Sequence, residues 1–587
     1  MELIREKTLT ATGAWLVRYA LENLPISHTF GIPGVHNTEL YDEINKSNTL
    51  TPVLVTHEAG AAFMADGISR TSDNIGTLLI VPSAGITHAM SGIAEAFLDG
   101  IPMLVISGGI RRDIKHSFQL HDWDQHKAMA SVCKKTYLIK DYSEIVPSIF
   151  EAYEIACAKK PGPVFIEIPV NIQLFKGQLS RLESFVPRKN TMTLKKDEFR
   201  KACALIAKAK NPGLFVGWGA KEATKELIEI AETLGSPVAT TLQGLSVFPG
   251  SHPLHTGMGY GDYSVPAAKN AFSDCDLLVA IGCSFGEIPT GSFSMKVPEN
   301  LIHIDIDPSV FNKNYPAKIT LEADAKAACK MILEIFKDMN LEPQDSSKLS
   351  CQIAKNKDQY LHEWLNHKFK KVNPAKFITS LRERIKHDAM TVVDDGNHTF
   401  LMAELFTVYF TKHFISPTDF NCMGYAVPAT IGAKIANPEK QVISVVGDGA
   451  FMMTCMEIIT AKSLQLDIVY FVFNDGELAQ IAQGQKTPYN KKTCTILGKF
   501  DLSGVAKATG SLYFSIEKDV DIDRVIEDSL LIAKEKRSPV IVDVKIDYSK
   551  KTKFTQGVVK AVLQKFPLKD KVRFVGRALW RKVNTPD

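Results

Sequence analysis

Short runs of apolar residues, rich in β-branched side chains, alternate with longer amphipathic stretches along the chain. This alternation constrains the fold more than any other feature. Clear apolar runs lie at residues 77–82, 103–107, 277–281, 301–306, 442–446 and 468–473. Continuous apolar runs of this length are typical of parallel strands that helices cover on both faces. The pattern therefore predicts an α/β protein.

The chain is too long for one core. Its 587 residues favour three domains, each with its own apolar interior. Polar or charged stretches at 187–198 and 342–359 interrupt the rhythm and are the expected linkers. We therefore predict domains at 1–185, 190–340 and 360–548, followed by a tail at 549–587.

Composition excludes several classes of protein. A net charge of +4 is too small for a nucleic-acid-binding surface over the whole molecule, so no nucleic-acid partner is expected. Ten cysteines without a CxxC pair favour reduced thiols and a cytoplasmic location. Residues 1–7 lack the apolar core of a signal peptide, and no apolar run is long enough to span a membrane.

The most specific motif lies in the third predicted domain. Gly447-Asp448-Gly449-Ala450 follows the apolar run at 442–446, and Asn474-Asp475 follows the run at 468–473. The two carboxylates should therefore meet at the carboxyl ends of two parallel strands, where open α/β sheets bind ligands. Glycines and a following helix N-terminus suit a phosphate, and carboxylate oxygens suit Mg²⁺.

This motif resembles that of the thiamine diphosphate enzymes, in their acetolactate synthase-like and 2-oxo acid decarboxylase branch. The family usually has Asn-Asn at the second place, so Asp475 departs from the common form but keeps an oxygen ligand. The resemblance implies that Asp448, Asp475 and the carbonyl of Glu477 hold Mg²⁺. It also implies that the cofactor is bound by Gly447, Gly449, Ala450 and Asn474. For a single Gly-Asp-Gly, the alternative is an ordinary turn.

A second match lies in the first domain. Thr56-His57-Glu58-Ala59 follows an expected strand at 53–55 and opens a helix rich in small residues. In the acetolactate synthase-like branch, a glutamate at this place pairs with N1′ of the aminopyrimidine. The resemblance thus makes Glu58 the catalytic residue whose proton lets the 4′-amino group take up the C2 proton. The alternative is an acid that the helix dipole favours at a helix start.

Further segments extend the resemblance over nearly the whole chain. They lie at 30–34, 94–97, 118–119, 304–308, 396–398 and 423–428. By this comparison Asn397 and His398 touch the diphosphate, and Met423 wedges between the two cofactor rings. Gln119 would face the reacting carbon. The alternatives are a core methionine for Met423 and a loop residue for Gln119.

The family also implies an architecture. Its three flavodoxin-like, doubly wound domains bind the pyrimidine, form the middle, and bind the diphosphate, in that order. In the family, the glutamate that matches Glu58 comes from one subunit and the metal site from another. A monomer could not complete the site, so a homodimer or homotetramer is implied.

The reaction is less constrained than the cofactor. After a 2-oxo acid loses CO₂, the enamine can take a proton to release an aldehyde, or attack a second carbonyl in a carboligation. We therefore expect a thiamine diphosphate-dependent decarboxylase or carboligase that acts on a small 2-oxo acid or a related carbonyl substrate. A 2-hydroxyacyl lyase, a peripheral membrane oxidase and a non-catalytic scaffold are the alternatives.

The sequence differs from related enzymes in two segments that affect the expected substrate. Acetolactate synthases carry a GARFDDRVTG segment, but Ser284 and Ile288 replace its arginines here. This loss argues against a literal acetolactate synthase and against a requirement for FAD. Val35 stands where simple pyruvate decarboxylases have an acid, and His36 lies in a segment resembling decarboxylases of longer 2-oxo acids. His36 is therefore a catalytic candidate for a substrate with a polar or extended tail, or else a structural histidine.

The tail changes composition sharply. From Lys550 onward it has eleven basic residues against Asp570 and Asp587, and an apolar stripe at helical spacing that comprises Val572, Val575, Leu579 and Val583. A basic amphipathic helix suits an anionic membrane surface, which would make peripheral membrane contact a second partner. The favoured alternative is a lid over the active site or a subunit neighbour.

Overall fold

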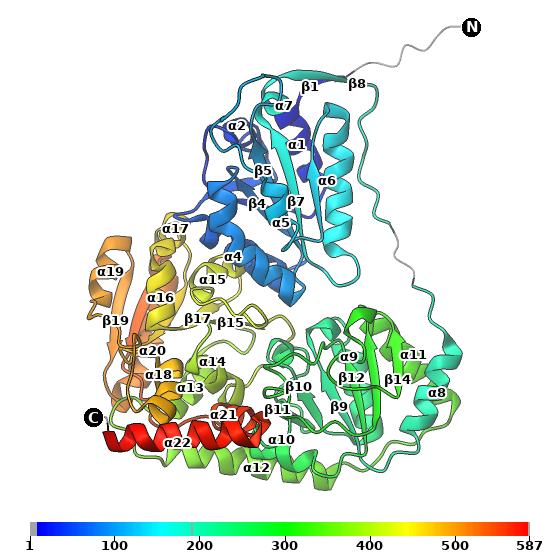
Figure 1. The fold of residues 1–587 in the computed structure, drawn as a ribbon, viewed down its shortest axis with the longest axis vertical. Coiled ribbons are helices and arrows are strands. Elements are labelled where there is room, and N and C mark those ends of the chain that lie inside the picture. The colour runs from blue at the N-terminus through cyan, green and yellow to red at the C-terminus, as the bar shows by residue number, and fades with distance from the viewer. Residues whose placement is uncertain (1–8, 189–191, 585–587) are drawn as a thin grey trace.

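The computed structural model describes residues 9–188 and 192–584. They form three α/β bodies, each built on a six-stranded sheet in which every pair of neighbouring strands is parallel (Figure 1). All six apolar runs named above are strands. The predicted α/β class with doubly wound parallel sheets is therefore confirmed. Residues 1–7, residues 189–191 of the first expected linker and residues 585–587 of the tail lie outside the described part.

The first body has the strand order β3-β2-β4-β5-β7-β6. Its central strands are buried along their whole length because helices cover both faces. The short antiparallel pair β1 (Leu9–Thr12) and β8 (Lys176–Leu179) brings the two ends of this body together. The other elements are β2 (His28–Gly31), β3 (Thr51–Leu54), β4 (Gly76–Ile80), β5 (Met103–Gly109), β6 (Lys135–Leu138), β7 (Pro163–Pro169), α1 (Gly13–Glu22), α2 (Thr38–Ile44), α3 (Glu58–Thr71), α4 (Ala84–Asp99), α5 (Gln125–Met129), α6 (Tyr142–Cys157) and α7 (Val170–Leu174).

The middle body differs from the other two in strand order. Its sheet runs β11-β10-β9-β12-β13-β14, which in chain order is the 3-2-1-4-5-6 arrangement of dinucleotide-binding folds. The outer two sheets instead share the order 2-1-3-4-6-5, which begins as flavodoxin-like sheets do. The elements are β9 (Pro212–Val216), β10 (Val238–Thr240), β11 (His255–Met258), β12 (Leu277–Ile281), β13 (Asn300–Asp305), β14 (Ile319–Glu322), α8 (Lys196–Ile206), α9 (Thr224–Leu234), α10 (Pro266–Ala271), α11 (Ala325–Asp338), η1 (Trp218–Ala220), η2 (Gln243–Ser246) and η3 (Pro308–Val310).

The third body is built on the sheet β16-β15-β17-β18-β20-β19. The second expected linker is mostly helical, because α12 (Ser347–Leu365) occupies it and buries Ile353, Tyr360 and Trp364. The remaining elements are β15 (Met390–Val393), β16 (Phe414–Ile415), β17 (Val442–Gly447), β18 (Val469–Phe473), β19 (Leu512–Ile516), β20 (Val540–Val544), α13 (Pro374–Arg384), α14 (Asn397–Leu405), α15 (Ala426–Ala436), α16 (Asp448–Thr454), η4 (Cys455–Glu457), α17 (Ile458–Ser463), α18 (Ala479–Tyr489), α19 (Leu502–Thr509), η5 (Asp519–Asp521) and α20 (Ile522–Lys536).

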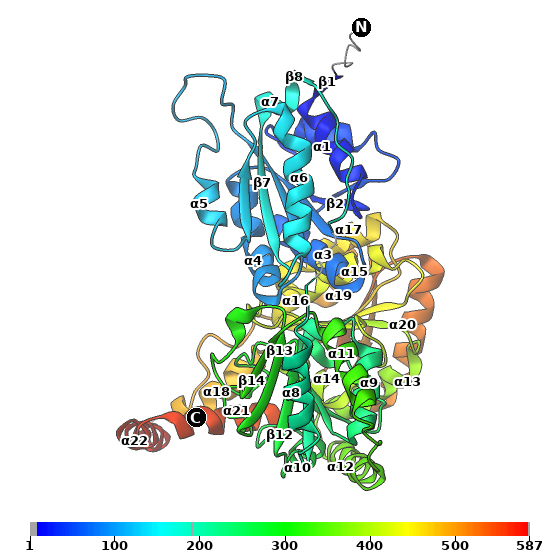
Figure 2. The ribbon, with the colours of Figure 1, turned by 90° about the vertical axis from the view of Figure 1, so that its right-hand side faces the viewer.

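The tail consists of two helices, α21 (Lys553–Lys565) and α22 (Leu568–Asn584). α21 is anchored by Phe554, whose ring stacks on Phe400 with centroids 4.1 Å apart. α22 lies at the periphery of the molecule, where Figure 2 views it end-on. Arg581 of α22 donates a hydrogen bond to the carbonyl of Pro488 in α18. The described part of the chain contains no helix long and apolar enough to span a membrane.

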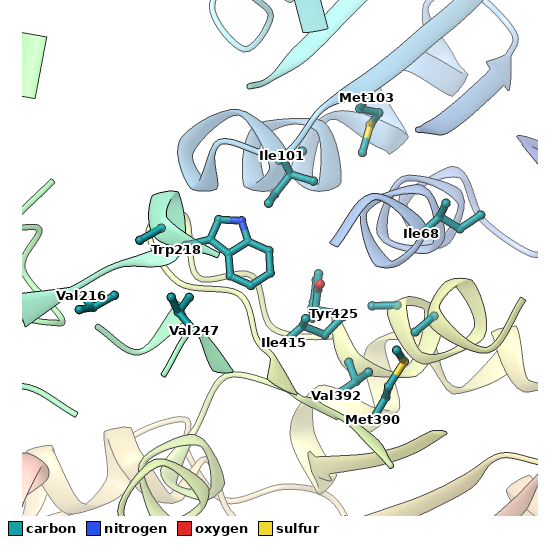
Figure 3. Close-up of a cluster of buried hydrophobic side chains, with 14 of the residues drawn as sticks. Ile68, Ile101, Met103, Val216, Trp218, Val247, Met390, Val392, Ile415 and Tyr425 are labelled. Atoms are coloured by element: carbon teal, nitrogen blue, oxygen red, sulfur yellow. The ribbon is translucent and has the colours of Figure 1, made fainter. Parts of the chain in front are cut away.

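Side chains from all three bodies pack into one apolar cluster. The ring of Trp218 in the middle body is directed toward Ile101 of the first body and Tyr425 and Ile415 of the third (Figure 3). α3 and α15 also approach closely because both carry small residues. A Cβ added at Gly67 would lie only 2.3 Å from the carbonyl oxygen of Ala429. This packing holds α3 of the first body directly against α15 of the third.

Candidate cofactor site

A cavity lies at the carboxyl ends of β15, β17 and β18. β15 and β17 are neighbours in the sheet, with β16 on one side and β18 on the other, so the chain reverses its winding direction between them. This is where open α/β sheets form a ligand crevice. The cavity contains about 560 Å³ of empty space, and its walls are Asp395–His398, Met423, Gly447–Ala450, Phe473, Asp475, Glu477–Ile481 and Tyr548. The sequence motifs of the third body therefore meet in one place.

Two acids lie together at this cavity. Asp448, the first residue of α16, accepts hydrogen bonds from the backbone N–H of Gly449 at 2.8 Å and of Gly476 at 2.7 Å. Burial raises the pKa of Asp448 above its ordinary range. Burial, together with the charges of Asp448 and Glu477, raises the pKa of Asp475 to about 7. A divalent cation would offset this crowding of negative charge, and the donors are the hard oxygens that Mg²⁺ prefers.

Backbone hydrogen bonds join the loop that carries Asp475 to the segment around residues 495–497. Leu478 donates its backbone N–H to Thr495 at 2.8 Å, and Leu497 donates to Gly476 at 2.9 Å. The carboxylate of Glu477 is paired with Lys492, with one oxygen 2.6 Å from the ammonium nitrogen. This pairing engages the side chain of Glu477, and the resemblance assigns the metal role to the backbone carbonyl of the same residue.

Several polar atoms that are buried at the cavity have no hydrogen-bond partner among the described residues. They are Nδ2 of Asn397, Nε2 of His398, Oε1 of Gln480 and the hydroxyl of Tyr548. Buried polar groups are nearly always hydrogen-bonded, so a polar ligand in the cavity would supply the missing partners of these atoms. Burial lowers the pKa of His398 to about 3, so its imidazole is neutral. Asn397 and His398 open the nine-residue helix α14, whose N-terminus suits a diphosphate.

The glycines of the motif are closely packed against neighbouring side chains. A Cβ added at Gly449 would lie 2.5 Å from Cδ2 of Leu478, and one at Gly447 would lie 3.0 Å from Cε1 of His398. Larger residues here would fill the cavity wall or displace His398. The cavity therefore fits a diphosphate group held against backbone, as the motif predicts.

Met423 is positioned by an acid that the sequence analysis did not single out. The buried carboxylate of Asp394 accepts the backbone N–H groups of Gly424 at 3.0 Å and Ala426 at 2.7 Å. These bonds fix the segment before α15 against the end of β15, so that Met423 lines the cavity. Asp394 directly precedes Asp395-Gly396-Asn397 in the sequence, which is the signal that could have identified it.

The side chains of Asn474 and Glu58 are not part of the cavity wall. The Asn474 side chain is not part of the cavity wall and donates to Asp543 at 3.0 Å. Glu58 begins α3 in the first body, is 6% exposed, and is likewise absent from the wall. All the residues that line the cavity lie between Asp395 and Tyr548. One chain therefore does not bring Glu58 into its own cavity wall.

Glu58 has a partner that the sequence did not reveal. Nδ1 of His88, on α4, lies 3.0 Å from Oε2 of Glu58. The His88 ring stacks on His57, and one ligand atom from each of the three side chains falls within 4.8 Å of the others. Nδ1 of His57 accepts the backbone N–H of Ala59, which leaves a proton on its Nε2 and no free lone pair for a metal. The geometry instead favours hydrogen-bonded support of Glu58.

Gln119 and His36 lie at the carboxyl end of the first sheet. Gln119 donates its side-chain amide to the carbonyl of Arg111 at 3.0 Å. The ring of His36 meets that of His121 edge to face, with centroids 5.2 Å apart. Burial, and then the nearby His121, lower the pKa of His36, and its buried Nδ1 has no partner among the described residues. These two side chains are near the first body's ligand edge but apart from the cavity of the third body.

Comparisons with known proteins identify the family of the chain. Residues 11–129, 199–332 and 394–544 match the N-terminal TPP binding domain, the central domain and the C-terminal TPP binding domain of the thiamine pyrophosphate enzymes. The chain is 30% identical over 554 residues to the probable acetolactate synthase large subunit of Methanocaldococcus jannaschii, covering 91% of this chain and 92% of that protein. It is 30% identical over 552 residues to the acetolactate synthase large subunit of Buchnera aphidicola, covering 92% and 95%.

Proposed function

Because the chain belongs to the thiamine pyrophosphate enzymes, in the branch that contains the acetolactate synthase large subunits, we propose that it is a Mg²⁺-dependent decarboxylase or carboligase of 2-oxo acids. The observation that carries the proposal is the cavity in which Asp448 and Asp475 adjoin the unpartnered polar atoms of Asn397 and His398. Negative charge on one side and unused hydrogen-bonding groups on the other suit a metal diphosphate.

Each wall of the cavity has a role in this proposal. Asp448, Asp475 and the Glu477 carbonyl hold the metal, and Asn397 and His398 at the N-terminus of α14 bind the diphosphate. When bound, thiamine diphosphate supplies an electron sink for the bond that breaks beside the substrate carbonyl. Gly447, Gly449 and Ala450 let the backbone approach the diphosphate, while Asn474 holds the end of β18 through Asp543.

Met423 would orient the two rings of the cofactor, and Glu58 would hold a proton at N1′. Since Glu58 does not line the cavity of its own chain, we propose that it enters the cavity of a second copy. Met453 and Met456 beside this region are 59% and 45% exposed, and line a second hollow together with His57 and Met423. An apolar surface at this place suits a homodimer or homotetramer with shared sites.

The substrate is proposed from the departures in the chain. Cys283 and Ser284 line a different cavity, at the carboxyl ends of β9, β12 and β13, with Trp218 and Asp305. Because Ser284 and Ile288 stand in place of the two arginines, no guanidinium is available there for a substrate carboxylate or a flavin. We therefore propose a 2-oxo acid other than that of a literal acetolactate synthase, and an enzyme that works without FAD.

One experiment separates the candidate reactions. A panel of 2-oxo acids, with CO₂ release and product mass measured together and with or without an added aldehyde, reports the donor and the fate of the product. Aldehyde release would identify a decarboxylase, and a ligated product a carboligase. Cleavage of a 2-hydroxyacyl substrate instead would identify a lyase. Stoichiometric flavin in active enzyme would contradict the proposal that FAD is not required.

Helix α22 of the tail has an exposed apolar stripe that could contact a partner. Val572, Val575, Leu579 and Val583 are each at least half exposed on α22. Basic residues flank this stripe, so peripheral contact with an anionic membrane is one candidate. α22 also lies against α18, which supplies Gln480 and Ile481 to the cavity wall, so a lid or assembly role is the favoured candidate. The location of the protein is proposed to be cytoplasmic because all ten cysteines are free thiols.

A further inference from the structure

A further cavity, distinct from those described above, lies beside β11, the edge strand of the middle sheet. β11, α12 and the carboxyl-terminal end of α14 form its walls, and it contains about 930 Å³ of empty space, part of it open to solvent. Its lining is mixed, and the apolar part includes Val265, Leu361 and Val408. It is separate from the cofactor cavity, which lies at the opposite end of α14.

His255 is a buried polar side chain of this cavity. It is 6% exposed, and neither of its ring nitrogens has a hydrogen-bond partner among the described residues. Burial holds the pKa of His255 well below its usual range, so the ring is neutral and offers one donor and one acceptor. A buried imidazole that uses neither nitrogen costs free energy unless a ligand or water supplies a partner.

Lys357 of α12 supplies a cation that no acid neutralises. Its ammonium group donates to the carbonyl of Gly250 at 3.3 Å, and it forms no ion pair within the described part of the chain. Burial lowers the pKa of Lys357 to about 8, and no carboxylate offsets that effect. Lys357 and His255 line the same cavity, and the charge of Lys357 adds to burial in lowering the pKa of His255.

The two acids of the lining do not serve Lys357. Glu404 accepts hydrogen bonds from the hydroxyl of Tyr360 and from the backbone N–H groups of Lys553 and Phe554. Asp358 is exposed and follows Lys357 directly on α12, so the two side chains point in different directions around the helix. The cavity thus combines an ammonium without an ion-pair partner, an imidazole without a hydrogen-bond partner and an apolar part of the wall, within the described part of the chain.

We propose that this cavity binds a short aliphatic monocarboxylate, whose carboxylate pairs with Lys357 and is hydrogen-bonded by His255. The aliphatic chain lies against Val265, Leu361 and Val408. The ligand's carboxylate has two oxygens that accept hydrogen bonds, which matches the donors of an ammonium and a neutral imidazole. The inference depends only on this cavity and is independent of the reaction at the cofactor site.

The test uses full-length protein saturated with thiamine diphosphate and Mg²⁺, titrated calorimetrically with propionate, butyrate and hexanoate at constant ionic strength. Butyramide is the uncharged control. Saturable binding of at least one acid, without binding of butyramide, is expected. Lys357→Met should weaken it roughly tenfold or more, because a buried charged hydrogen bond is lost. Lys355→Met, which removes an exposed lysine of the same helix, should leave binding unchanged.

The pH dependence adds a second criterion. Above pH 8 the Lys357 ammonium loses its proton, so affinity should fall about tenfold for each pH unit. Over that range His255 stays neutral and Glu404, whose pKa burial raises to about 7, stays ionised. No saturable binding of any acid, equal binding of butyramide, or binding by Lys357→Met equal to wild type would overturn the inference. His255→Gln, which keeps a donor and an acceptor, should bind more tightly than His255→Leu. Equal binding by those two variants would likewise count against it.

Discussion

The carboxylate of Asp448 accepts a hydrogen bond from the backbone N–H of Gly476 at 2.7 Å, although the two residues follow different strands. The bond joins the start of α16 to the loop after β18, and it keeps Asp475 beside Asp448. Two neighbouring carboxylates repel each other unless a cation lies between them. This pair of neighbouring carboxylates supports the metal site proposed above.

Asp448→Asn tests that role. The amide keeps the shape of the side chain but removes one negative charge and one strong oxygen ligand. We expect the Mg²⁺ concentration needed for half-maximal cofactor binding to rise by at least about 10–100-fold, the range typical of changes around a metal site. Asp528→Asn, on α20 with a side chain 48% exposed, is the matched control. An unchanged Mg²⁺ requirement in Asp448→Asn would refute the assignment.

Glu58→Gln tests the catalytic assignment separately from metal binding. The variant should still bind thiamine diphosphate, because Glu58 touches neither the metal nor the diphosphate. Exchange of the cofactor's C2 proton for deuterium, followed by NMR after acid quench, should slow by about two to four decades. Glu22→Gln, an exposed acid on α1, should exchange at the wild-type rate. If Glu58→Gln does so too, the assignment is wrong.

His88 should position Glu58 through the hydrogen bond at 3.0 Å. Losing a hydrogen bond to a charged group costs about 1.5–3 kcal/mol, so His88→Ala should lower the C2 exchange rate by about tenfold or more. Since the His88 side chain is 51% exposed in the chain, added imidazole should restore part of the rate. His367→Ala is the control for a general effect of removing a histidine. Wild-type exchange in His88→Ala would contradict this role.

Removal of the tail distinguishes its two candidate roles, membrane binding and service as a lid or assembly arm. If α22 binds a membrane, full-length enzyme should float with anionic vesicles at low salt, and protein ending at Tyr548 should not. If α22 is a lid or an assembly arm, neither protein should float, and the truncated one should lose activity or fall to a smaller oligomer. Gel filtration and the 2-oxo acid assay measure the second result. A truncated enzyme that behaves like the full chain in all three assays would contradict both roles.

The sequence predicted what local patterns determine. Apolar runs identified the buried strands, and polar residues directly after two such runs identified Asp448 and Asp475. The strand order of the middle sheet depends on packing between distant segments, so the apolar runs did not distinguish it. The contact between His88 and Glu58 joins two helices, and no sequence spacing between the two residues indicates it. Tyr548 was missed because its role comes from the return of the chain after β20, where the sequence shows no motif.

The most direct test of the account is the melting temperature of protein first stripped of cofactor by chelation and dialysis. Thiamine diphosphate is then added in the presence of Mg²⁺. We expect a saturable rise in melting temperature, since a ligand at 100 times its Kd stabilises the folded state by about 2.7 kcal/mol. Thiamine without the diphosphate, or thiamine diphosphate with EDTA, should give no comparable rise. An unchanged melting temperature with thiamine diphosphate and Mg²⁺ together would contradict the central claim.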